Sequence, residues 1–174
     1  LRMQIGFVGL GKMGFNLVLN LMRHGHSVVG YDINADLVNA IAAEGATPAH
    51  DLPAFFAALP QPRTVWLMIP AGPLIDTVLK QLQEAGLAAG DTVIDGGNSH
   101  FHDTLRRYRS LADARIHYVD CGTSGGTEAG LNGACTMVGG DRDVMEPLKE
   151  VFTQISVKDG FLYTGPAGSG HFTK

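Results

Sequence analysis

The stretch that decides the fold of this chain is Gly9-Leu10-Gly11-Lys12-Met13-Gly14. Its G-x-G-x-x-G spacing alone is a weak signal, because the 174 residues include 23 glycines. Its context makes it informative, since the apolar run Met3–Val8 precedes it and a helical pattern follows it. In that pattern Gly14, Leu17 and Leu21 share one helix face. We therefore predict a strand, a tight turn and a helix over this part of the chain.

The three glycines of this stretch have different expected roles at a dinucleotide site. Gly9 permits the tight turn, Gly11 lets the backbone approach the pyrophosphate, and Gly14 lets the helix pack closely on the sheet. The free N–H groups and the dipole at the helix N-terminus then favour the anionic pyrophosphate. The competing interpretation is an ordinary glycine-rich turn. The residues expected to bind the cofactor here are Gly9, Leu10, Gly11, Lys12, Met13 and Gly14.

Asp32 stands directly after the second apolar run, Ser27–Tyr31, and 18 residues after Gly14. The acidic residue that binds the adenosine ribose of NAD is expected about 20 residues beyond the glycine turn. A carboxylate there accepts a hydrogen bond from the 2′-hydroxyl group and repels a 2′-phosphate. No Lys or Arg occurs between Arg23 and Arg63 to neutralise such a phosphate. We therefore predict NAD rather than NADP; the alternative is that Asp32 only caps the next helix.

Strands alternate with helices along the rest of the chain, which indicates parallel strands covered on both faces. With the right-handed crossover rule, this pattern predicts an α/β fold with a doubly wound, mostly parallel sheet, the Rossmann-like NAD(P)-binding fold. We expect residues 1–164 to form this domain and residues 165–174 to begin a linker or helix. Further strands are expected at Ala46–Ala49, Thr64–Ile69, Thr92–Ile94, Ile116–Val119 and Phe161–Tyr163, and further helices at Asp51–Ala58, at Pro73–Leu82, after a cap at Ser99, and at Pro147–Phe152.

Composition and charge exclude several classes of protein. The formal net charge of −4 argues against a nucleic-acid binder, which would carry a basic stripe. No apolar run reaches the roughly 18–20 residues needed to cross a bilayer, and Arg2–Val8 has the pattern of a strand rather than of a signal peptide. Cys121 and Cys135 lack a metal-ligand spacing and are expected to be free thiols. We therefore expect a cytoplasmic protein with no nucleic-acid, membrane or metal partner.

Two further glycine-rich motifs follow predicted strands, where open α/β sheets bind their ligands. In Asp95-Gly96-Gly97-Asn98-Ser99, Asn98 could present its amide to a substrate hydroxyl, or it could be a turn or cap residue. In Ser124-Gly125-Gly126, the backbone N–H groups could form an anion-binding nest, or the element could be a structural turn. A serine nucleophile is disfavoured because the G-x-S-x-G elbow is missing.

The predicted helix that contains His100 and His102 also carries several arginines. The two histidines are two positions apart and are not expected to face each other, which disfavours a metal pair. Arg106, Arg107 and Arg109 could attract a phosphate, although a solvated helix face is the more common explanation.

Taken together, four stretches resemble the decarboxylating 6-phosphogluconate dehydrogenases, within the wider β-hydroxyacid dehydrogenase family. They are Gly9–Gly14, Asp95–Ser99, Ser124–Gly126 and Gly170-His171-Phe172-Thr173-Lys174, and they span the chain. The dinucleotide turn, the Ser-Gly-Gly element and a lysine are shared by the wider family. The pairing of Asp-Gly-Gly-Asn-Ser with Gly-His-Phe-x-Lys resembles the phosphogluconate branch in particular.

The details are more similar to the short, NAD-preferring members of that branch. Asp32-Ile33-Asn34 occupies the place where NADP-using members have a stretch similar to Asn-Arg-Thr. Pro70 lies in the segment where many long members have a lysine. The resemblance implies Lys174 and Asn98 as catalytic residues. It implies the substrate-binding residues Asn98, Ser124, Gly125, Gly126 and Lys174, and, beside the cofactor, Met68, Ile69, Pro70, Ala71 and Asn98.

The reaction implied by the resemblance is oxidation of the C3 hydroxyl of 6-phosphogluconate by hydride transfer to NAD, followed by loss of CO₂ to give ribulose 5-phosphate. A neutral lysine amine can take the hydroxyl proton and, once protonated, can stabilise the enolate. The family needs no metal. It has an all-helical C-terminal domain, outside this chain, that supplies much of the phosphate site and the dimer contact. We therefore expect a homodimer or homotetramer at full length and little or no activity in this fragment.

Two other interpretations stay open at the level of the sequence. The chain could be part of another β-hydroxyacid dehydrogenase, such as one for 3-hydroxyisobutyrate, although the context of Asn98 argues against it. It could also be a non-catalytic module that binds NAD and needs neither Lys174 nor Asn98 for its activity.

Overall fold

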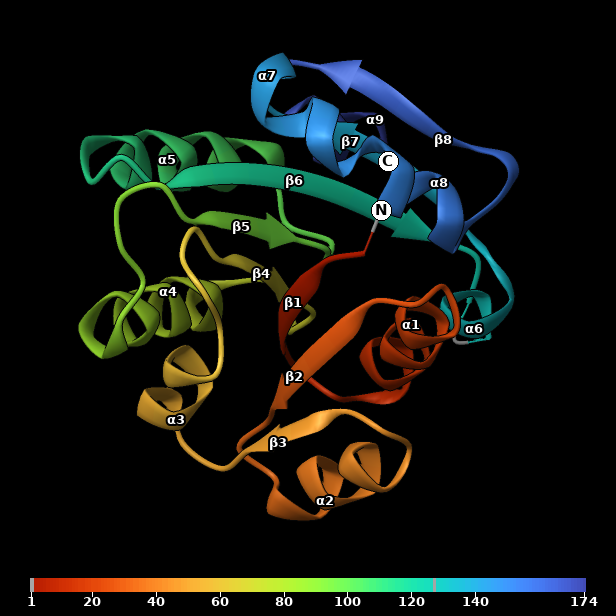
Figure 1. Cartoon of the computed structure of the whole chain (residues 1–174). Helices are drawn as coiled ribbons and strands as arrows, with labels where there is room; N and C mark the ends of the chain where they lie inside the picture. Colours follow the sequence, from red (N-terminus) through yellow and green to blue (C-terminus); the bar gives the residue numbers. More distant parts are fainter. Residues whose placement is uncertain (1, 127) are drawn as a thin grey trace.

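The computed structural model describes residues 2–126 and 128–174, and their strands form one eight-stranded sheet (Figure 1). The strands are β1 Gln4–Val8, β2 Ser27–Tyr31, β3 Thr47–Ala49, β4 Thr64–Leu67, β5 Thr92–Asp95, β6 His117–Ser124, β7 Ala134–Gly139 and β8 Ser156–Gly165. Their order in the sheet is β3-β2-β1-β4-β5-β6-β7-β8. Neighbouring strands from β3 to β6 are parallel, whereas β7 runs antiparallel to β6 and β8 runs parallel to β7. The predicted doubly wound, mostly parallel sheet is confirmed.

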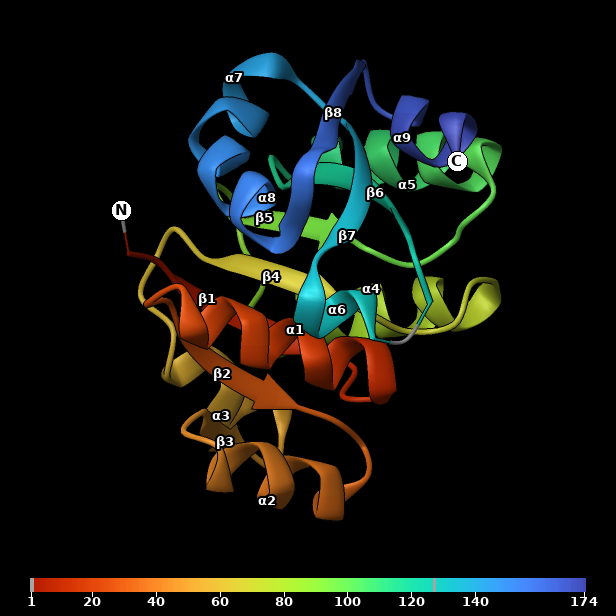
Figure 2. The same cartoon turned by 90° about the vertical axis from the view of Figure 1, so that its right-hand side faces the viewer.

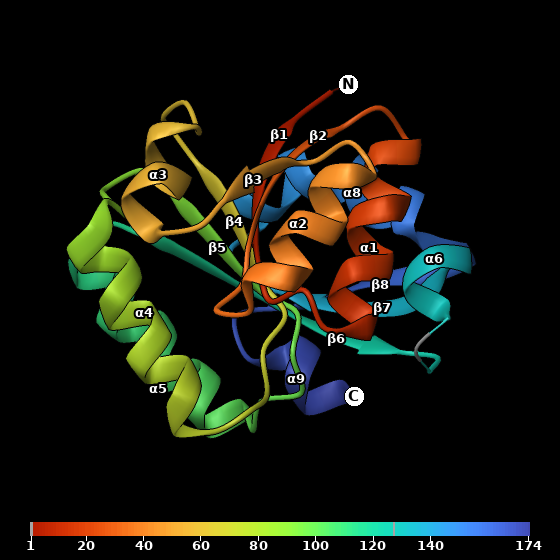
Figure 3. The same ribbon diagram turned by 90° about the horizontal axis from the view of Figure 1, so that it is seen from below.

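Helices cover both faces of the sheet, so the molecule has three layers. They are α1 Lys12–Arg23, α2 Ala35–Ala43, α3 Leu52–Ala57, α4 Pro73–Ala85, α5 Phe101–Asp113, α6 Ala129–Asn132, α7 Arg142–Met145, the 3₁₀ turn η1 Glu146–Leu148, α8 Lys149–Ile155 and α9 Ser169–Thr173. One apolar cluster joins the sheet to α1, α2 and α8, and a second joins it to α3, α4 and α5. Figure 3 shows α4 and α5 on one side of the strands and α1 and α2 on the other.

The central strands are apolar because both of their faces are buried. Alternate side chains of a strand point to opposite faces, and the two apolar clusters follow this alternation. Phe7 and Trp66 point to the α1 side, where their rings stack with centroids 5.9 Å apart. Val8 and Val65 point to the α4 side. Each such side chain contributes roughly 1.5–3 kcal/mol to the stability of the fold when it is fully buried. The burial of both faces therefore explains why the sheet lies between two layers of helices.

The strand order reverses between β1 and β4, and this reversal locates the ligand crevice. From β1 the chain continues to β2 and β3 on one side, and it then returns to β4 and proceeds outward on the other. The two connections that leave the carboxyl ends of β1 and β4 therefore diverge. In open α/β sheets ligands bind at such a point.

The far edge of the sheet differs from the prediction. β6 continues to Ser124, beyond the predicted end at Val119, and β7 was not predicted at all. Glycines at positions 133, 139 and 140 give this region the composition of a turn. β7 forms because it pairs antiparallel with residues 120–124 of β6. Such a distant partner cannot be predicted from the local periodicity of the sequence. The single helix predicted at Pro147–Phe152 is instead the run α7, η1 and α8.

Three properties of the described residues concern partners and reactivity. None of their helices combines the length and the apolar character needed to cross a membrane. They contain no group of three or more His, Cys, Asp and Glu side chains that could hold a metal ion. Cys121 and Cys135 are free thiols, as predicted, the first buried and the second exposed.

Candidate functional site

The turn after β1 brings glycine backbone into close contact with its neighbours. Gly9 has a φ of 103°, and a Cβ there would collide with the carbonyl oxygen of Met68, just after β4. A Cβ at Gly14 would collide with the carbonyl oxygen of Gly9, so α1 lies directly on the turn. A Cβ at Gly11 would meet nothing within 4 Å, because this position faces open space. The tight turn and the close packing therefore depend on Gly9 and Gly14, whereas Gly11 leaves room beside the helix.

The N-terminus of α1 has no capping side chain. Its N-cap residue is Gly11, whereas the side chains of Asn34 and Asp51 accept backbone hydrogen bonds at the N-termini of α2 and α3. The first N–H groups of a helix lack acceptors within the helix and carry the positive end of its dipole. The glycine turn therefore presents a site suited to an anion next to the open space at Gly11. Lys12 and Met13, the next two predicted cofactor residues, form the first turn of α1.

Asp32 lies just beyond β2, and its carboxylate is held against the glycine turn. Its Oδ2 accepts a hydrogen bond from the Leu10 N–H at 2.7 Å, and its Oδ1 accepts one from the Asn34 N–H at 2.9 Å. The cap of α2 is Asn34, whose side chain accepts from the Asp36 N–H at 3.0 Å. Asp32 therefore ties the turn to β2 and is not the capping residue of α2.

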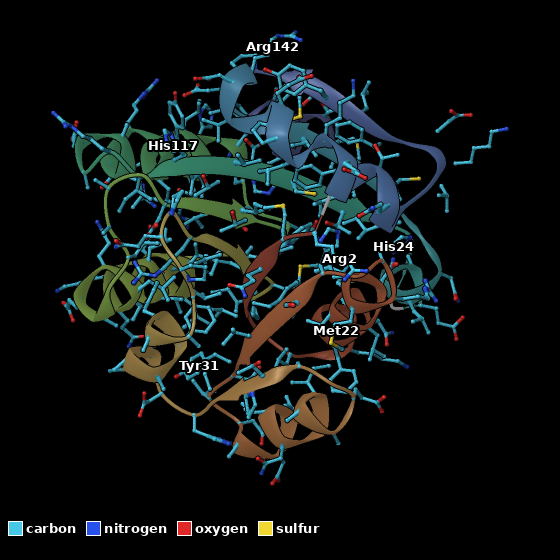
Figure 4. The ribbon with its side chains drawn as sticks, viewed as in Figure 1. Arg2, Met22, His24, Tyr31, His117 and Arg142 are labelled. Carbon is cyan, nitrogen blue, oxygen red and sulfur yellow. The ribbon has the colours of Figure 1, made fainter. Side chains whose placement is uncertain are left out.

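A cavity of about 390 Å³ lies beside the glycine turn, between the carboxyl ends of β1, β2 and β4. Its lining is largely apolar, and Asp32 is its charged residue. Tyr31, labelled in Figure 4, lies on its wall at the end of β2. Ile33 is 93% exposed on its rim. An apolar slot with a single carboxylate suits a flat aromatic group joined to a sugar. The lining residues outside the prediction are Val8, Tyr31, Ile33, Leu37, Leu52, Leu74, Val78 and Gln81.

Two smaller cavities continue along the carboxyl ends of the strands. The second, of about 240 Å³, shares Met68, Ile69 and Pro70 with the first and adds Ala71 and Asn98. The third, of about 190 Å³, is lined by Asn98, Ser99, His171 and Lys174. Because successive cavities share residues, they form a row that runs from Asp32 past the loop after β4 to Lys174. The structure thus brings Asn98 and Lys174 together in one cavity, although 76 positions separate them.

A buried carboxylate organises the turn that carries Asn98. Asp95 accepts hydrogen bonds from the Gly97 N–H at 3.1 Å, the Ser99 hydroxyl at 3.1 Å and the Tyr118 hydroxyl at 2.7 Å. Burial, together with the Asp95 carboxylate, raises the pKa of the Tyr118 hydroxyl well above its usual value, so this group remains a hydrogen-bond donor. Asn98 itself is exposed at the junction of the second and third cavities.

The prediction that Ser99 caps α5 is wrong. The N-cap residue is His100, whose side chain accepts from the His102 N–H. Ser99 is buried instead, because its hydroxyl bridges Asp95 and Arg107. The expectation that His100 and His102 do not face each other is also wrong, since their rings stack with centroids 5.1 Å apart. His100 lies just before the helix, where helical spacing does not apply.

Lys174 reaches the site because α9 lies on β6. A Cβ at Gly122 would lie 2.8 Å from the Cβ of Lys174, so the lysine stem crosses the strand at a position without a side chain. Asp120 accepts hydrogen bonds from the N–H groups of Gly168 at 2.7 Å and His171 at 2.9 Å. The ring of His171 contacts the Asp95 carbonyl oxygen through Nε2 at 3.2 Å. Figure 2 shows α9 beside α5 at the end of the chain.

The Ser124-Gly125-Gly126 element begins at the last residue of β6 rather than after a loop. Gly125 and Gly126 have φ values of 125° and 74°, which favour glycine. Ser124 lies two positions beyond Gly122, so its side chain points to the same sheet face as Lys174 and α9. Ser124 is not among the residues that line the third cavity, which are Asn98, Ser99, His171 and Lys174.

Several residues that shape the site are outside the sequence-based prediction. Asp95 and Asp120 are partners in adjacent strands and are fully buried, each just after an apolar run. This position, directly after an apolar run, was the sequence feature that could have identified both residues. Thr123, which donates to the Gly96 carbonyl oxygen at 3.2 Å and lines the second cavity, carried no such signal. Arg106 and Arg107, considered as phosphate-attracting residues, both pair with Asp76.

Comparison with known proteins gives a family match over most of the chain. Residues 4–165 match the family described as the NAD binding domain of 6-phosphogluconate dehydrogenase. The Bacillus subtilis (strain 168) protein YqeC, whose name gives it provisionally as a 6-phosphogluconate dehydrogenase, is 45% identical over 172 residues, which are 99% of this chain and 57% of YqeC. The NAD(+)-dependent, decarboxylating 6-phosphogluconate dehydrogenase of Haloferax volcanii is 40% identical over 99% of this chain and 56% of its own length. The chain therefore spans little more than half of these relatives.

Two solved structures share the fold closely. The 6-phosphogluconate dehydrogenase of Plasmodium falciparum, studied with NADP+ and with 6-phosphogluconate, superimposes with a TM-score of 0.90 at 27% identity and covers 97% of this chain and 38% of its own. The 3-hydroxyisobutyrate dehydrogenase of Mycobacterium tuberculosis superimposes with a TM-score of 0.88 at 25% identity and covers 99% of this chain and 58% of its own. The fold is thus common to both groups of enzymes.

Proposed function

This chain belongs to the family of the NAD-binding domain of 6-phosphogluconate dehydrogenase, and from that premise we propose that it serves a decarboxylating, NAD-dependent member of the family. The proposed reaction oxidises 6-phosphogluconate to ribulose 5-phosphate and CO₂. The observation that carries this proposal is the row of three cavities, which begins at Asp32 and ends at Asn98 and Lys174. A dinucleotide needs such an extended series of subsites, and its reactive end must meet the substrate.

The residues present fit an extended dinucleotide. The first cavity is apolar with one carboxylate, which suits an adenine ring and its ribose. The uncapped N-terminus of α1 and the empty space at Gly11 suit the pyrophosphate. The second cavity, between Met68–Ala71 and Asn98, then suits the nicotinamide. When bound, NAD supplies the hydride acceptor for oxidation of the substrate alcohol.

We assign the third cavity to the substrate alcohol. Lys174 would take the proton of the hydroxyl group through its neutral amine, and after protonation it would stabilise the negative charge on the oxygen as CO₂ leaves. Asn98 borders both the second and the third cavity, so its amide can orient the substrate hydroxyl toward the nicotinamide side. Ser124, Gly125 and Gly126 are proposed substrate contacts at the end of β6.

The preference for NAD over NADP is proposed from the position of Asp32. Its carboxylate is held in place by two backbone N–H groups, so it cannot easily turn away from a 2′-phosphate. Isothermal titration calorimetry with NAD and NADP tests this assignment in wild type, Asp32→Asn and Asp36→Asn. We expect Asp32→Asn to raise the NADP-to-NAD affinity ratio by about tenfold or more, corresponding to about 1.4 kcal/mol. Asp36, exposed on α2, is the matched control, and an unchanged ratio in Asp32→Asn would refute the assignment.

Turnover by the full-length protein tests the proposed reaction. Lys174→Met should abolish release of CO₂ from 6-phosphogluconate while NAD still binds, and Asn98→Ala should lower kcat strongly. Activity with 3-hydroxyisobutyrate and not with 6-phosphogluconate would instead favour the second enzyme class, whose fold is equally similar. Cofactor binding without turnover of either acid would favour a non-catalytic module.

The whole protein is proposed to be longer than this domain. We propose that residues 1–164 form the dinucleotide-binding domain and that residues 165–174 lead into a C-terminal helical domain. The match to little more than half of each relative supports this arrangement. That domain would complete the phosphate site and the contact of a homodimer or homotetramer. A cytoplasmic location is consistent with the two free thiols.

A further inference from the structure

Arg107 of α5 is buried, and it contacts the chain on both sides of the second cavity. Its Nη2 donates to the Gly72 carbonyl oxygen at 3.1 Å, and its Nη1 donates to the Ser99 hydroxyl oxygen at 3.3 Å. Gly72 directly follows the segment Met68–Ala71, which forms one wall of the cavity, and Ser99 directly follows Asn98 in the other wall. One side chain therefore connects two loops that leave different strands, β4 and β5.

The guanidinium of Arg107 is itself held in a fixed position. Its Nε donates to Oδ1 of Asp76 at 2.9 Å, and its Nη2 donates to Oδ2 at 3.2 Å. Asp76 lies in the first turn of α4, which begins at the end of the loop that Arg107 contacts. The Arg107 side chain is only 2% exposed, so the loss of these partners would leave a buried charge unpaired.

We propose that Arg107 is a positioning residue that ties the loop after β4 to the turn after β5 and so sets the width of the second cavity. The identity of the ligand there, the nicotinamide ring, rests on the proposed function. A planar guanidinium can serve three acceptors in different directions, whereas a lysine ammonium on a flexible stem cannot hold the same fork. Loss of this geometry should therefore affect the nicotinamide end and spare the adenosine end.

Arg106 provides an unusually close control. It is the preceding residue of the same helix, carries the same charge and pairs with the same carboxylate, at 3.0 and 3.1 Å. Its side chain is 56% exposed, and its second ion pair is with Asp103 on α5. Arg106 thus shares the charge and the Asp76 contact of Arg107, while the hydrogen bonds to Gly72 and Ser99 belong to Arg107.

The experiment compares Arg107→Lys with Arg106→Lys in the full-length protein. Amide hydrogen exchange should become faster in residues 68–72 and 96–99 of Arg107→Lys and stay unchanged in Arg106→Lys. A displacement of about 1 Å can cost about 100-fold in the chemical step, so kcat should fall by tenfold or more in Arg107→Lys. The KM for NAD and the affinity for ADP-ribose, which lacks nicotinamide, should change by less than about threefold, because the adenosine subsite is separate.

Three results would overturn the proposal. Exchange in both segments could stay unchanged in Arg107→Lys, it could rise equally in Arg106→Lys, or it could rise throughout the sheet. If Arg107→Lys does not fold, Ser99→Ala is the second variant. It removes one hydrogen-bond acceptor of the Arg107 guanidinium. The proposal then requires faster amide exchange at Gly97 and Asn98. The exchange result does not depend on turnover. A wild type that binds no nicotinamide cofactor would refute the proposed function, while the exchange comparison would still decide the role of Arg107.

Discussion

Asp120 of β6 holds His171 of α9 through a hydrogen bond of 2.9 Å between its carboxylate and the His171 N–H. The other carboxylate oxygen accepts from the Gly168 N–H at 2.7 Å. A buried acid in the sheet therefore satisfies two N–H groups at the start of α9, the helix that leads directly to Lys174. This arrangement fixes the last turn of the chain to the strand below it, where Gly122 leaves room for the lysine stem.

We expect Asp120→Asn to destabilise the protein by about 1–3 kcal/mol, because one of the two N–H groups then faces an amide donor in a buried place. The free energy of unfolding, measured with urea, tests this value. Asp113→Asn, at an exposed position of α5, should change it by less than about 0.5 kcal/mol. Equal losses in the two variants would show that the buried hydrogen bonds at Asp120 are not the cause.

Gly11 and Gly14 should respond differently to the same added methyl group. In Gly14→Ala the methyl group meets the Gly9 carbonyl oxygen, and we expect a loss of about 1–3 kcal/mol in the free energy of unfolding. In Gly11→Ala it meets open space at a φ of −63°, so stability should change by less than about 0.5 kcal/mol. Calorimetry should nevertheless find weaker NAD binding in Gly11→Ala. Unchanged NAD affinity there would contradict the proposed pyrophosphate site.

Asp76 should make stability depend on pH in the acid range. Hydrogen bonds from Arg107 and then Arg106 lower the pKa of its carboxyl from 3.8 to about 2. A lowered pKa in the folded state stabilises the protein above the unfolded value, and this stabilisation is lost as the pH falls from about 4 to about 2. The difference in unfolding free energy between wild type and Asp76→Asn should therefore be constant at higher pH and shrink across that window. Because the side chain is 37% exposed, solvent screening limits the expected difference to about 1 kcal/mol. A difference that does not change between these pH values would contradict the assignment.

The two cysteines should differ sharply in reactivity. Burial raises the pKa of the Cys121 thiol to about 12, so it carries almost no thiolate at neutral pH, whereas Cys135 is exposed. A thiol reagent such as Ellman's reagent should modify one thiol in the native protein and both after denaturation. In Cys135→Ser the native protein should not react. A rapid reaction of native Cys135→Ser would show that Cys121 is accessible.

The central half of the fold follows from local patterns in the chain. The apolar runs at β1, β2 and β5 and the helix face Gly14, Leu17 and Leu21 have the periods that these elements need, and both sides of the sheet are covered. The motifs also place Gly9, Asp32 and Asn98 beyond the carboxyl ends of the parallel strands β1, β2 and β5. These positions are predictable because a strand end and a turn are defined by adjacent residues.

The far edge and the walls of the site could not be predicted in this way. β7 is a short run between glycines, and it becomes a strand through its partners β6 and β8. The role of Ser99 changes from cap to bridge because Arg107, eight residues later, turns back onto it. Thr123 reaches the Gly96 carbonyl oxygen across 27 positions. None of these contacts can be predicted from the periodicity of the sequence.

The sequence by itself determined the strand–turn–helix unit at Gly9–Gly14 and the alternation of elements that produces a doubly wound sheet, because both depend on residues a few positions apart. Only the tertiary structure decided that Asn98 and Lys174 share a cavity, that Asp120 anchors α9 and that Arg107 bridges two loops. The physical reason is that buried carboxylates and guanidinium groups take their partners from wherever the packed sheet brings a donor or acceptor within about 3 Å.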